Sequence, residues 1–214
     1  MFLDEKIIEA TGTISQRFLM LVQALSGIRG LSSLDINTID EQDLLNKTLS
    51  TLNQNLDFES CSIFLLQNND ELHCLAGIGQ GDKENSVMDN DEETHTFKLG
   101  QGIIGQAAIT RQLYHCKDCK QDKNYLPILH SPKHNNIGSI ICVPIITGGE
   151  LLGVLNVSHP QPFFFHSWQE HVFSIHADIF AQMLHNQRLM KDMVAQVNNR
   201  TKELQHSLEE TKIL

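Results

Sequence analysis

Residues 138–157 read GSIICVPIITGGELLGVLNV, and this stretch decides the fold. Two apolar runs rich in β-branched residues, Ser139–Ile146 and Leu151–Val157, flank Thr147-Gly148-Gly149-Glu150. Glycine adopts positive φ without steric cost, so a Gly-Gly pair between two such runs predicts a tight antiparallel hairpin. Both runs are apolar almost throughout, so both strands are predicted to be buried.

One very long helix is predicted to follow this hairpin. Ser167 and Glu170 have the spacing of a capping box, and no glycine or proline interrupts residues 163–214. A heptad repeat through this helix predicts a coiled coil. Its two seam positions are Phe180, Gln187, Val194, Thr201 and Leu208, and Met183, Met190, Val197, Leu204 and Thr211. An exposed helix of this length is not stable alone in water, so a second copy of the chain is the expected partner.

Helices and strands alternate upstream of the hairpin. The apolar periodicity predicts helices over residues 15–28 and after Asp40, which is expected to cap the second helix. The remaining predicted elements are strands at 60–66, 72–76, 94–99 and 113–116, a long loop at 77–93 and a short helix ending near Thr110. These elements divide the chain into an N-terminal helix and connector at 1–39, a central domain at 40–190 and an extended helix at 191–214.

The composition excludes several classes of protein. The chain has 214 residues and a formal net charge of −10, and an acidic surface repels the phosphates of nucleic acids. No apolar run is long enough to span a bilayer, and the N-terminus lacks the apolar core of a signal peptide. Five cysteines without a secretory context predict free thiols in a reducing cytoplasm.

Three local sequences, in this order of elements, resemble the GAF domain, a relative of the PAS domain. They are LGQGIIGQAAITRQ at 99–112, YHCKDCKQDKNYLP at 114–127 and GSIICVPIITGGELLGVLNVSHPQPFFF at 138–165. The resemblance covers about residues 40–190. It implies an α+β fold: a GAF-like central antiparallel sheet with helices packed on one face, followed by a long C-terminal coiled-coil helix.

The end of the chain resembles the signalling helices that join sensor domains to histidine kinase or diguanylate cyclase domains. VNNRTKELQHSLEETKIL at 197–214 carries this resemblance, and no motif of either output domain is present. We therefore expect a non-enzymatic sensor segment of a longer signal-transduction protein. It is expected to form a homodimer through the C-terminal helix.

A GAF fold would surround a small-molecule pocket with residues from several strands and loops. By this resemblance the candidate pocket residues are His95, Phe97, His115, Asp118, Ser139, Cys142 and Asn156. The alternative is that side chains fill this space, which would leave a purely structural dimerisation module.

Cys116-x-x-Cys119 followed by His130-x-x-x-His134 has ligand types and spacing suited to zinc. Pro132 argues against a simple helical pair of histidines. The same thiols are also candidates for a redox dithiol, because nearby Lys117 and Lys120 would lower a thiol pKa. The alternative is two inert, solvent-exposed thiols. Cys61, Cys74 and Cys142 lie within predicted strands and are expected to be buried.

Departures from known patterns limit the choice of cofactor, whose identity the sequence leaves open. Asn156 is followed by Val157 where cyclic-nucleotide-binding GAF domains carry Asn-Lys, which argues against that ligand. No cysteine precedes His or Phe, so no covalent bilin is expected. Gly100-x-Gly102-x-x-Gly105 matches a dinucleotide fingerprint, but without a βαβ unit it predicts a tight turn. A thiol-based reductase using Cys116 and Cys119 remains the enzymatic alternative.

Overall fold

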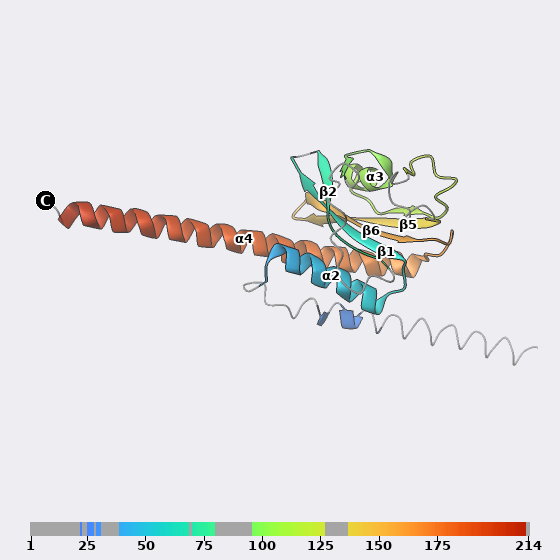
Figure 1. Cartoon of the computed structure of the whole chain (residues 1–214), viewed down its shortest axis with the longest axis horizontal. Coiled ribbons are helices and arrows are strands. Elements are labelled where there is room, and N and C mark those ends of the chain that lie inside the picture. Colours follow the sequence, from blue (N-terminus) through green and yellow to red (C-terminus); the bar gives the residue numbers. More distant parts are fainter. Residues whose placement is uncertain are drawn as a thin grey trace, which may run out of the picture.

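The computed structural model describes residues 39–68, 70–79, 96–126 and 137–212, together with residues 22, 25–27, 29 and 30. Within these ranges, six strands form one sheet in the order β3-β2-β1-β6-β5-β4. Every neighbouring pair is antiparallel. Helices α2 and α4 cover one face of the sheet, the α4 face, while the short helix α3 lies on the opposite α3 face (Figure 1). The predicted α+β architecture is therefore confirmed, but its helices cover both faces of the sheet rather than one, because α3 packs on the face opposite α4 (Figure 1).

The predicted hairpin lies in the interior of the sheet. Strand β5, Ser139–Thr147, pairs with strand β6, Glu150–His159, and β6 pairs on its other side with β1. Gly148 and Gly149 have φ of 57° and 81°, as the Gly-Gly turn requires. Almost every residue of the two strands is buried, because helices cover both faces.

A third glycine brings β6 close to its neighbour β1. A Cβ on Gly153 would lie 2.0 Å from the carbonyl oxygen of Phe64. No larger residue fits at this distance unless the backbone moves.

Strands β1, Ser60–Gln67, and β2, Glu71–Gly79, form the predicted first hairpin. Strand β2 is longer than predicted, because residues 77–79 continue the pairing with Ser60–Ser62 rather than opening a loop. Strand β3, Thr96–Lys98, adds the edge. The rest of the predicted loop, at 80–93, lies outside the described residues.

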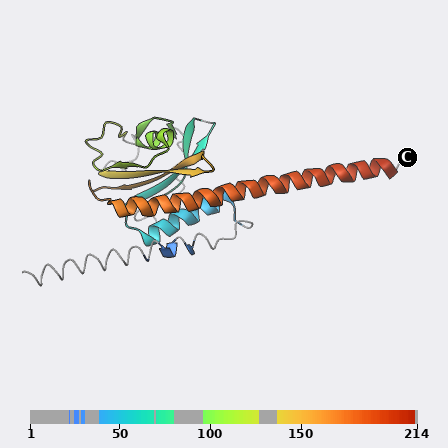
Figure 2. The same cartoon turned by 180° about the vertical axis from the view of Figure 1, so that it is seen from behind.

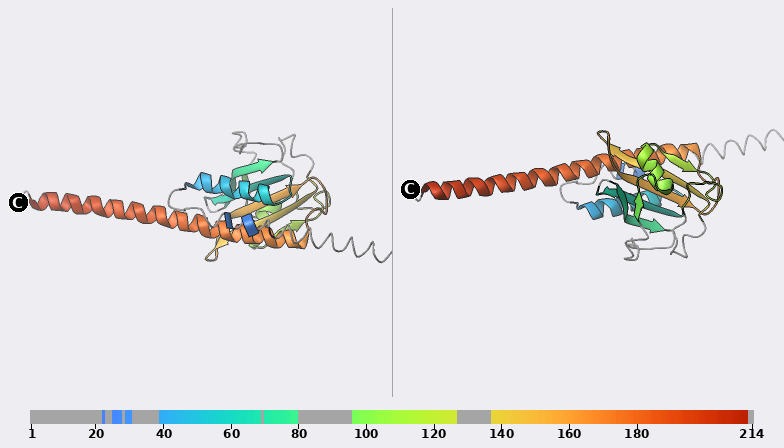
Figure 3. Two further views of the ribbon diagram at one scale, coloured as in Figure 1. Left: turned by 90° about the horizontal axis from the view of Figure 1, so that it is seen from below. Right: turned by 90° about the horizontal axis from the view of Figure 1, so that it is seen from above.

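Helix α2, Glu41–Asn55, and the first part of α4 form the layer on the α4 face, side by side when seen from below (Figure 3). Asp40 caps α2 as predicted, because its carboxylate accepts from the Asp43 amide at 2.7 Å. Leucines of α2 meet aromatic residues of α4 over the sheet. The largest fully buried members of this core include Leu44, Leu45, Leu49, Leu52, Phe58, Phe173 and Phe180.

Helix α4 spans Ser167–Lys212, and its start differs by one residue from the predicted capping box. The Gln169 side chain accepts from the His166 amide at 2.8 Å, so His166, not Ser167, precedes the first turn. Glu170, the expected capping acid, instead contacts His115. A Gln at the third helical position satisfies the same amide as a Glu, which leaves Glu170 free for a tertiary contact.

The burial of α4 ends abruptly at Gln187. This side chain is 1% exposed and donates to the Ile39 carbonyl at 2.6 Å, and Arg188 pairs with Glu41 at 2.7 Å. All described residues from Leu189 to Gln205 are exposed, and the helix projects away from the domain (Figures 1 and 2). Phe180, Met183 and Gln187 pack within their own domain, so the open part of the predicted heptad seam begins at Met190.

The short helix α3, Gly102–Thr110, begins at the predicted glycine-rich turn. Gly100 and Gly102 have positive φ, and a Cβ on Gly105 would lie 2.3 Å from the Lys98 carbonyl. The three glycines thus form the predicted tight turn, which holds α3 close to β3. Strand β4, Tyr114–Cys116, follows and pairs with β5.

The predicted helix at 15–28 lies largely outside the described residues. Within the part of the chain that the structure describes, no helix is both long and apolar enough to cross a membrane.

Candidate functional site

The α3 face of the sheet carries a second, smaller core beneath α3. Its members alternate along each strand with residues of the main core, as expected for a sheet covered on both sides. Phe64 of β1, Cys142 of β5 and Val154 of β6 belong to this face, while their neighbours Leu65, Val143 and Leu155 face α4.

A line of polar side chains crosses the three central strands on this face. Ser62, Asn156 and Cys142 occupy paired positions on β1, β6 and β5. The Cys142 thiol donates to Asn156 Oδ1 at 3.4 Å, and Asn156 Nδ2 donates to the Ser62 hydroxyl at 3.2 Å. Burial raises the pKa of the Cys142 thiol, so this thiol stays neutral and serves as a donor. We call these three residues the polar line.

Ser62 was not among the predicted site residues. Ser60 and Ser62 alternate with Cys61 and Ile63 in an otherwise apolar strand, and this period-2 pattern is the signal that could have identified them. Ser60, two residues before Ser62 on β1, makes a similar contact, because its hydroxyl lies 2.7 Å from that of Ser158 on β6.

Phe97 of β3 lies on the same face as the polar line. Its ring packs edge-on against Phe64 with centroids 5.6 Å apart. The side chain is 9% exposed, and a Cβ on Gly102 would lie 3.6 Å from the Phe97 ring. Three of the predicted pocket residues, Phe97, Cys142 and Asn156, therefore share the α3 face.

Cys116 and Cys119 belong to this core, and each is only 2% exposed. Their sulfur atoms are 3.5 Å apart, within the distance of a thiol–thiol hydrogen bond. Burial raises the pKa of Cys116 to about 11, and the charge of Asp122 adds to this effect. The predicted lowering by Lys117 and Lys120 is wrong because both lysines are exposed and desolvation dominates. The alternative of solvent-exposed thiols is wrong as well.

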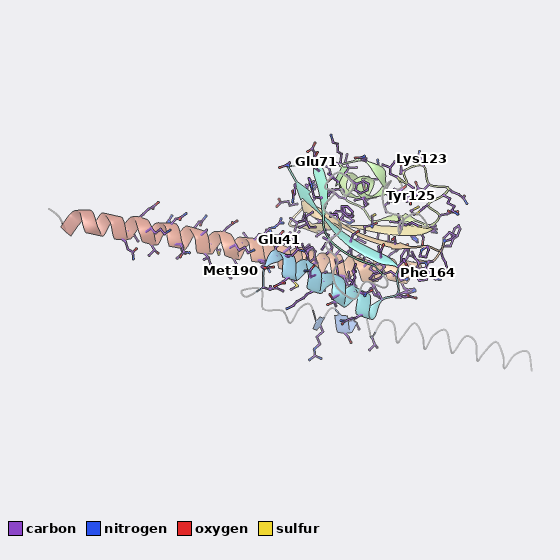
Figure 4. All side chains as sticks on the ribbon, viewed as in Figure 1. Glu41, Glu71, Lys123, Tyr125, Phe164 and Met190 are labelled. Atoms are coloured by element: carbon purple, nitrogen blue, oxygen red, sulfur yellow. The ribbon has the colours of Figure 1, made fainter. Side chains whose placement is uncertain are left out.

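The turn after β4 is held by its own carboxylates. Asp118 accepts from the Lys120 amide at 3.0 Å and from the Gln121 side chain at 2.7 Å. Asp122 accepts from the Tyr114 hydroxyl at 2.9 Å. The Asp118 carboxylate is therefore engaged in hydrogen bonds within its own turn. Lys123 and Tyr125 follow on the same side of the sheet as α3 (Figure 4).

Two other predicted pocket residues lie on the α4 face. His115 is paired with Ile141, and its Nδ1 lies 2.6 Å from the Glu170 carboxylate of α4. Ser139 is two residues from Ile141 on β5, so both side chains point to the same face of the sheet. The Ser139 hydroxyl donates to the Gln161 carbonyl at 2.8 Å. The sheet therefore separates both side chains from the polar line, and they do not belong to one site with it.

His95, His130 and His134, the remaining predicted candidates, lie outside the described residues. Among the residues that are described, no three histidine, cysteine or carboxylate side chains converge as a metal site would require. The zinc site thus stays a prediction, and only two of its four expected ligands, Cys116 and Cys119, are among the described residues.

Comparisons with known proteins agree with this geometry. The chain is 23% identical over 158 residues to a probable 3′,5′-cyclic phosphodiesterase of Caenorhabditis elegans, covering 72% of the chain but only 21% of that relative. The GAF domain of an Acinetobacter phosphoenolpyruvate-protein phosphotransferase superposes with a TM-score of 0.62 at 17% identity, covering 79% of this chain and 94% of that one.

A free methionine-R-sulfoxide reductase of Neisseria meningitidis, solved with its substrate, superposes with a TM-score of 0.66. It is 16% identical and covers 82% of this chain and 93% of that one, so the likeness concerns the fold alone. The GAF domain family model matches residues 40–184, which include the whole sheet, the helices on both of its faces and most of the buried part of α4. The chain therefore belongs to the GAF domain family.

Proposed function

We propose that this chain is the sensor part of a longer signal-transduction protein. A small ligand, or a change of redox or metal state, alters the packing on the α3 face, and α4 transmits the change to an output domain. The single observation that supports this most directly is the continuity of α4. One helix packs against the domain up to Gln187 and then continues to Lys212, and every residue from Leu189 to Gln205 is exposed.

Strand β4 provides a route from one face to the other. Tyr114 and Cys116 contribute to the core of the α3 face, while His115 between them contacts Glu170 in the first turn of α4. The short carboxylate–imidazole contact of 2.6 Å is largely removed from solvent. A displacement of β4 would therefore move the start of α4.

The exposed half of α4 has the seam of a parallel two-stranded coiled coil. Val194 and Thr201 are β-branched and occupy one seam position, while Val197 and Leu204 occupy the other. This distribution favours two parallel strands. Val197 and Leu204 are 63% and 66% exposed, so a second copy of the chain would bury them. By the resemblance of residues 197–214 to signalling helices, the output is a diguanylate cyclase or a histidine kinase.

The polar line is the part of the α3 face best suited to recognise a ligand. It places an amide, a hydroxyl and a thiol side by side in an apolar environment. The likeness to a cyclic phosphodiesterase and to a methionine sulfoxide reductase suggests two ligand classes for testing. We propose that the domain binds without catalysing a reaction, because burial suppresses the thiolate of Cys116.

Thermal unfolding with a ligand panel tests this proposal. The panel contains cyclic nucleotides, free methionine sulfoxide, haem and zinc. A ligand at one hundred times its Kd should stabilise the domain by about 2.7 kcal/mol, a shift of several degrees in Tm. Asn156→Ala should abolish the shift, whereas Gln67→Ala at the exposed end of β1 should retain it.

Two outcomes would contradict the sensor proposal. Absence of stabilisation by every compound would support a structural dimerisation module. Turnover of methionine sulfoxide that is lost in Cys116→Ser would instead support the reductase alternative.

A further inference from the structure

Cys116 and Cys119 are positioned to react with each other. Their sulfur atoms are 3.5 Å apart in the reduced protein, and a disulfide requires about 2.0 Å. The required approach is thus on the order of 1.5 Å within one four-residue turn. We propose that these two thiols form a reversible intramolecular disulfide, and that this bond is a modification site controlling how the turn holds the base of α4.

One hydrogen bond of the turn distinguishes the two sulfurs. Cys116 accepts from the Asp118 amide, and this contact stabilises a thiolate on Cys116, whereas the carboxylate of Asp122 opposes it. Cys116 is therefore the attacking sulfur and Cys119 the resolving sulfur. Lys117, Lys120 and Gln121 are exposed, so local opening of this turn gives an oxidant access.

The oxidant is a low-molecular-weight disulfide, RSSR. The Cys116 thiolate attacks one sulfur of RSSR, which breaks that S–S bond, releases one thiolate and leaves a mixed disulfide. Cys119 loses its proton and displaces the second thiolate, which forms the Cys116–Cys119 bond. The two protons from the cysteines are taken up by the released thiolates. The protein thus loses two electrons and two protons, and RSSR becomes two RSH.

Strand β4 and the turn after it contact the first turn of α4 and the segment that leads into it. The Lys117 carbonyl accepts from the Phe163 amide at 2.7 Å, and Phe163 lies four residues before α4 with a positive φ of 59°. His115, the neighbour of Cys116, contacts Glu170 in the first helical turn. Lys117 lies between the two cysteines in the sequence, so closure of the disulfide shifts its backbone. Only this last step, from the turn to α4, rests on the proposed function.

Thiol trapping on the full chain tests the bond itself. The reduced protein is incubated with glutathione disulfide, unfolded, and labelled with a maleimide of high mass. We expect loss of two of the five reactive thiols, and a cross-link between Cys116 and Cys119 within one peptide. Dithiothreitol should restore all five. A protein that keeps five reactive thiols, or a bond that involves Cys142, would overturn the proposal.

The wild-type peptide map does not depend on any variant, so it remains decisive if a substitution impairs folding. Cys119→Ser should stop at a mixed disulfide on Cys116. Cys61→Ser, on the α4 face, should still form the bond. Because only the thiolate attacks a disulfide, the rate of bond formation should increase with pH between pH 7 and pH 9.

Hydrogen exchange tests the link to α4. Oxidation should change the exchange of amides from Phe163 to Glu170 and leave those of α2 unchanged. If the bond forms and these amides do not respond, the control of α4 is refuted. Ligand stabilisation and dimerisation are measured separately, so a failure here would not be confused with failure of the proposed sensor function.

Discussion

His176 is a buried histidine in the main core, where a protonated imidazole is unfavourable. Its side chain has no solvent exposure, Nδ1 lies 2.8 Å from the Val172 carbonyl, and Nε2 has no partner among the described residues. Desolvation lowers the pKa of this imidazole below its ordinary value of about 6.5, and the contact with Val172 opposes the shift only in part. The native protein therefore contains a neutral histidine that the unfolded chain would protonate more readily.

This difference predicts a pH dependence of stability. Well above pH 6.5 the imidazole is neutral in both states and contributes no dependence. Below it the unfolded state binds more protons, so the free energy of unfolding should decrease as the pH falls toward the native pKa, with a slope of at most about 1.4 kcal/mol per pH unit. Urea unfolding of wild type and His176→Leu between pH 5 and pH 8 measures the difference. Parallel profiles for the two proteins would contradict it.

At the same scale, the sequence could not assign every site residue to a face. Neighbouring residues of a strand point to opposite faces, so Cys142 lies opposite Val143, but the uniformly apolar sequence of β5 does not show which of the two faces α4. Strand β4 has only three residues, so its register against β5 decides that His115 faces α4. Thiol burial was equally unreadable, because it results from tertiary packing rather than from Cys-x-x-Cys spacing.

The elements themselves were largely predictable. The hairpin at β5 and β6 follows from two apolar runs and a Gly-Gly turn, and the cap of α2 follows from Asp40. The errors occur where two residues could make the same capping contact, or where a strand could either end or continue its pairing. Gln169 and Glu170 are both able to close the first turn of α4, and only the position of His115 shows that Glu170 is used elsewhere. Likewise, β2 extends to Gly79 because β1 supplies a partner for it.

The close contact between β6 and β1 gives a prediction for the sheet. Gly153→Ala places a methyl group against the backbone of Phe64, where no side-chain rotation relieves the overlap, and should cost about 3 kcal/mol in the free energy of unfolding. Gly149→Ala is the matched control. Its surroundings are open and only its positive φ is strained, so it should cost about 1 kcal/mol. Equal losses in chemical denaturation would contradict this account.

The whole molecule consists of a packed domain and a helix that leaves it. Met190 marks this point, just beyond the contact between Arg188 and Glu41 (Figure 4). Up to Gln187 one side of α4 is packed against the domain, so the helix direction depends on the sheet. Beyond Gln187 only a partner is able to stabilise the exposed seam, because an isolated helix gains little stability in water. Pairing of two helices would therefore couple two domains.

Sedimentation velocity tests this arrangement. The chain should be dimeric at high micromolar concentration, and the double variant Val197→Glu, Leu204→Glu should be monomeric with reduced helix content, because four carboxylates would meet in the seam of the dimer. Asn199→Glu is the matched control, since residue 199 is exposed and lies on the opposite side of the helix from Val197 and Leu204. It adds charge without entering the seam and should remain dimeric. A monomeric wild type, or dissociation by Asn199→Glu alone, would show that α4 does not pair along this seam.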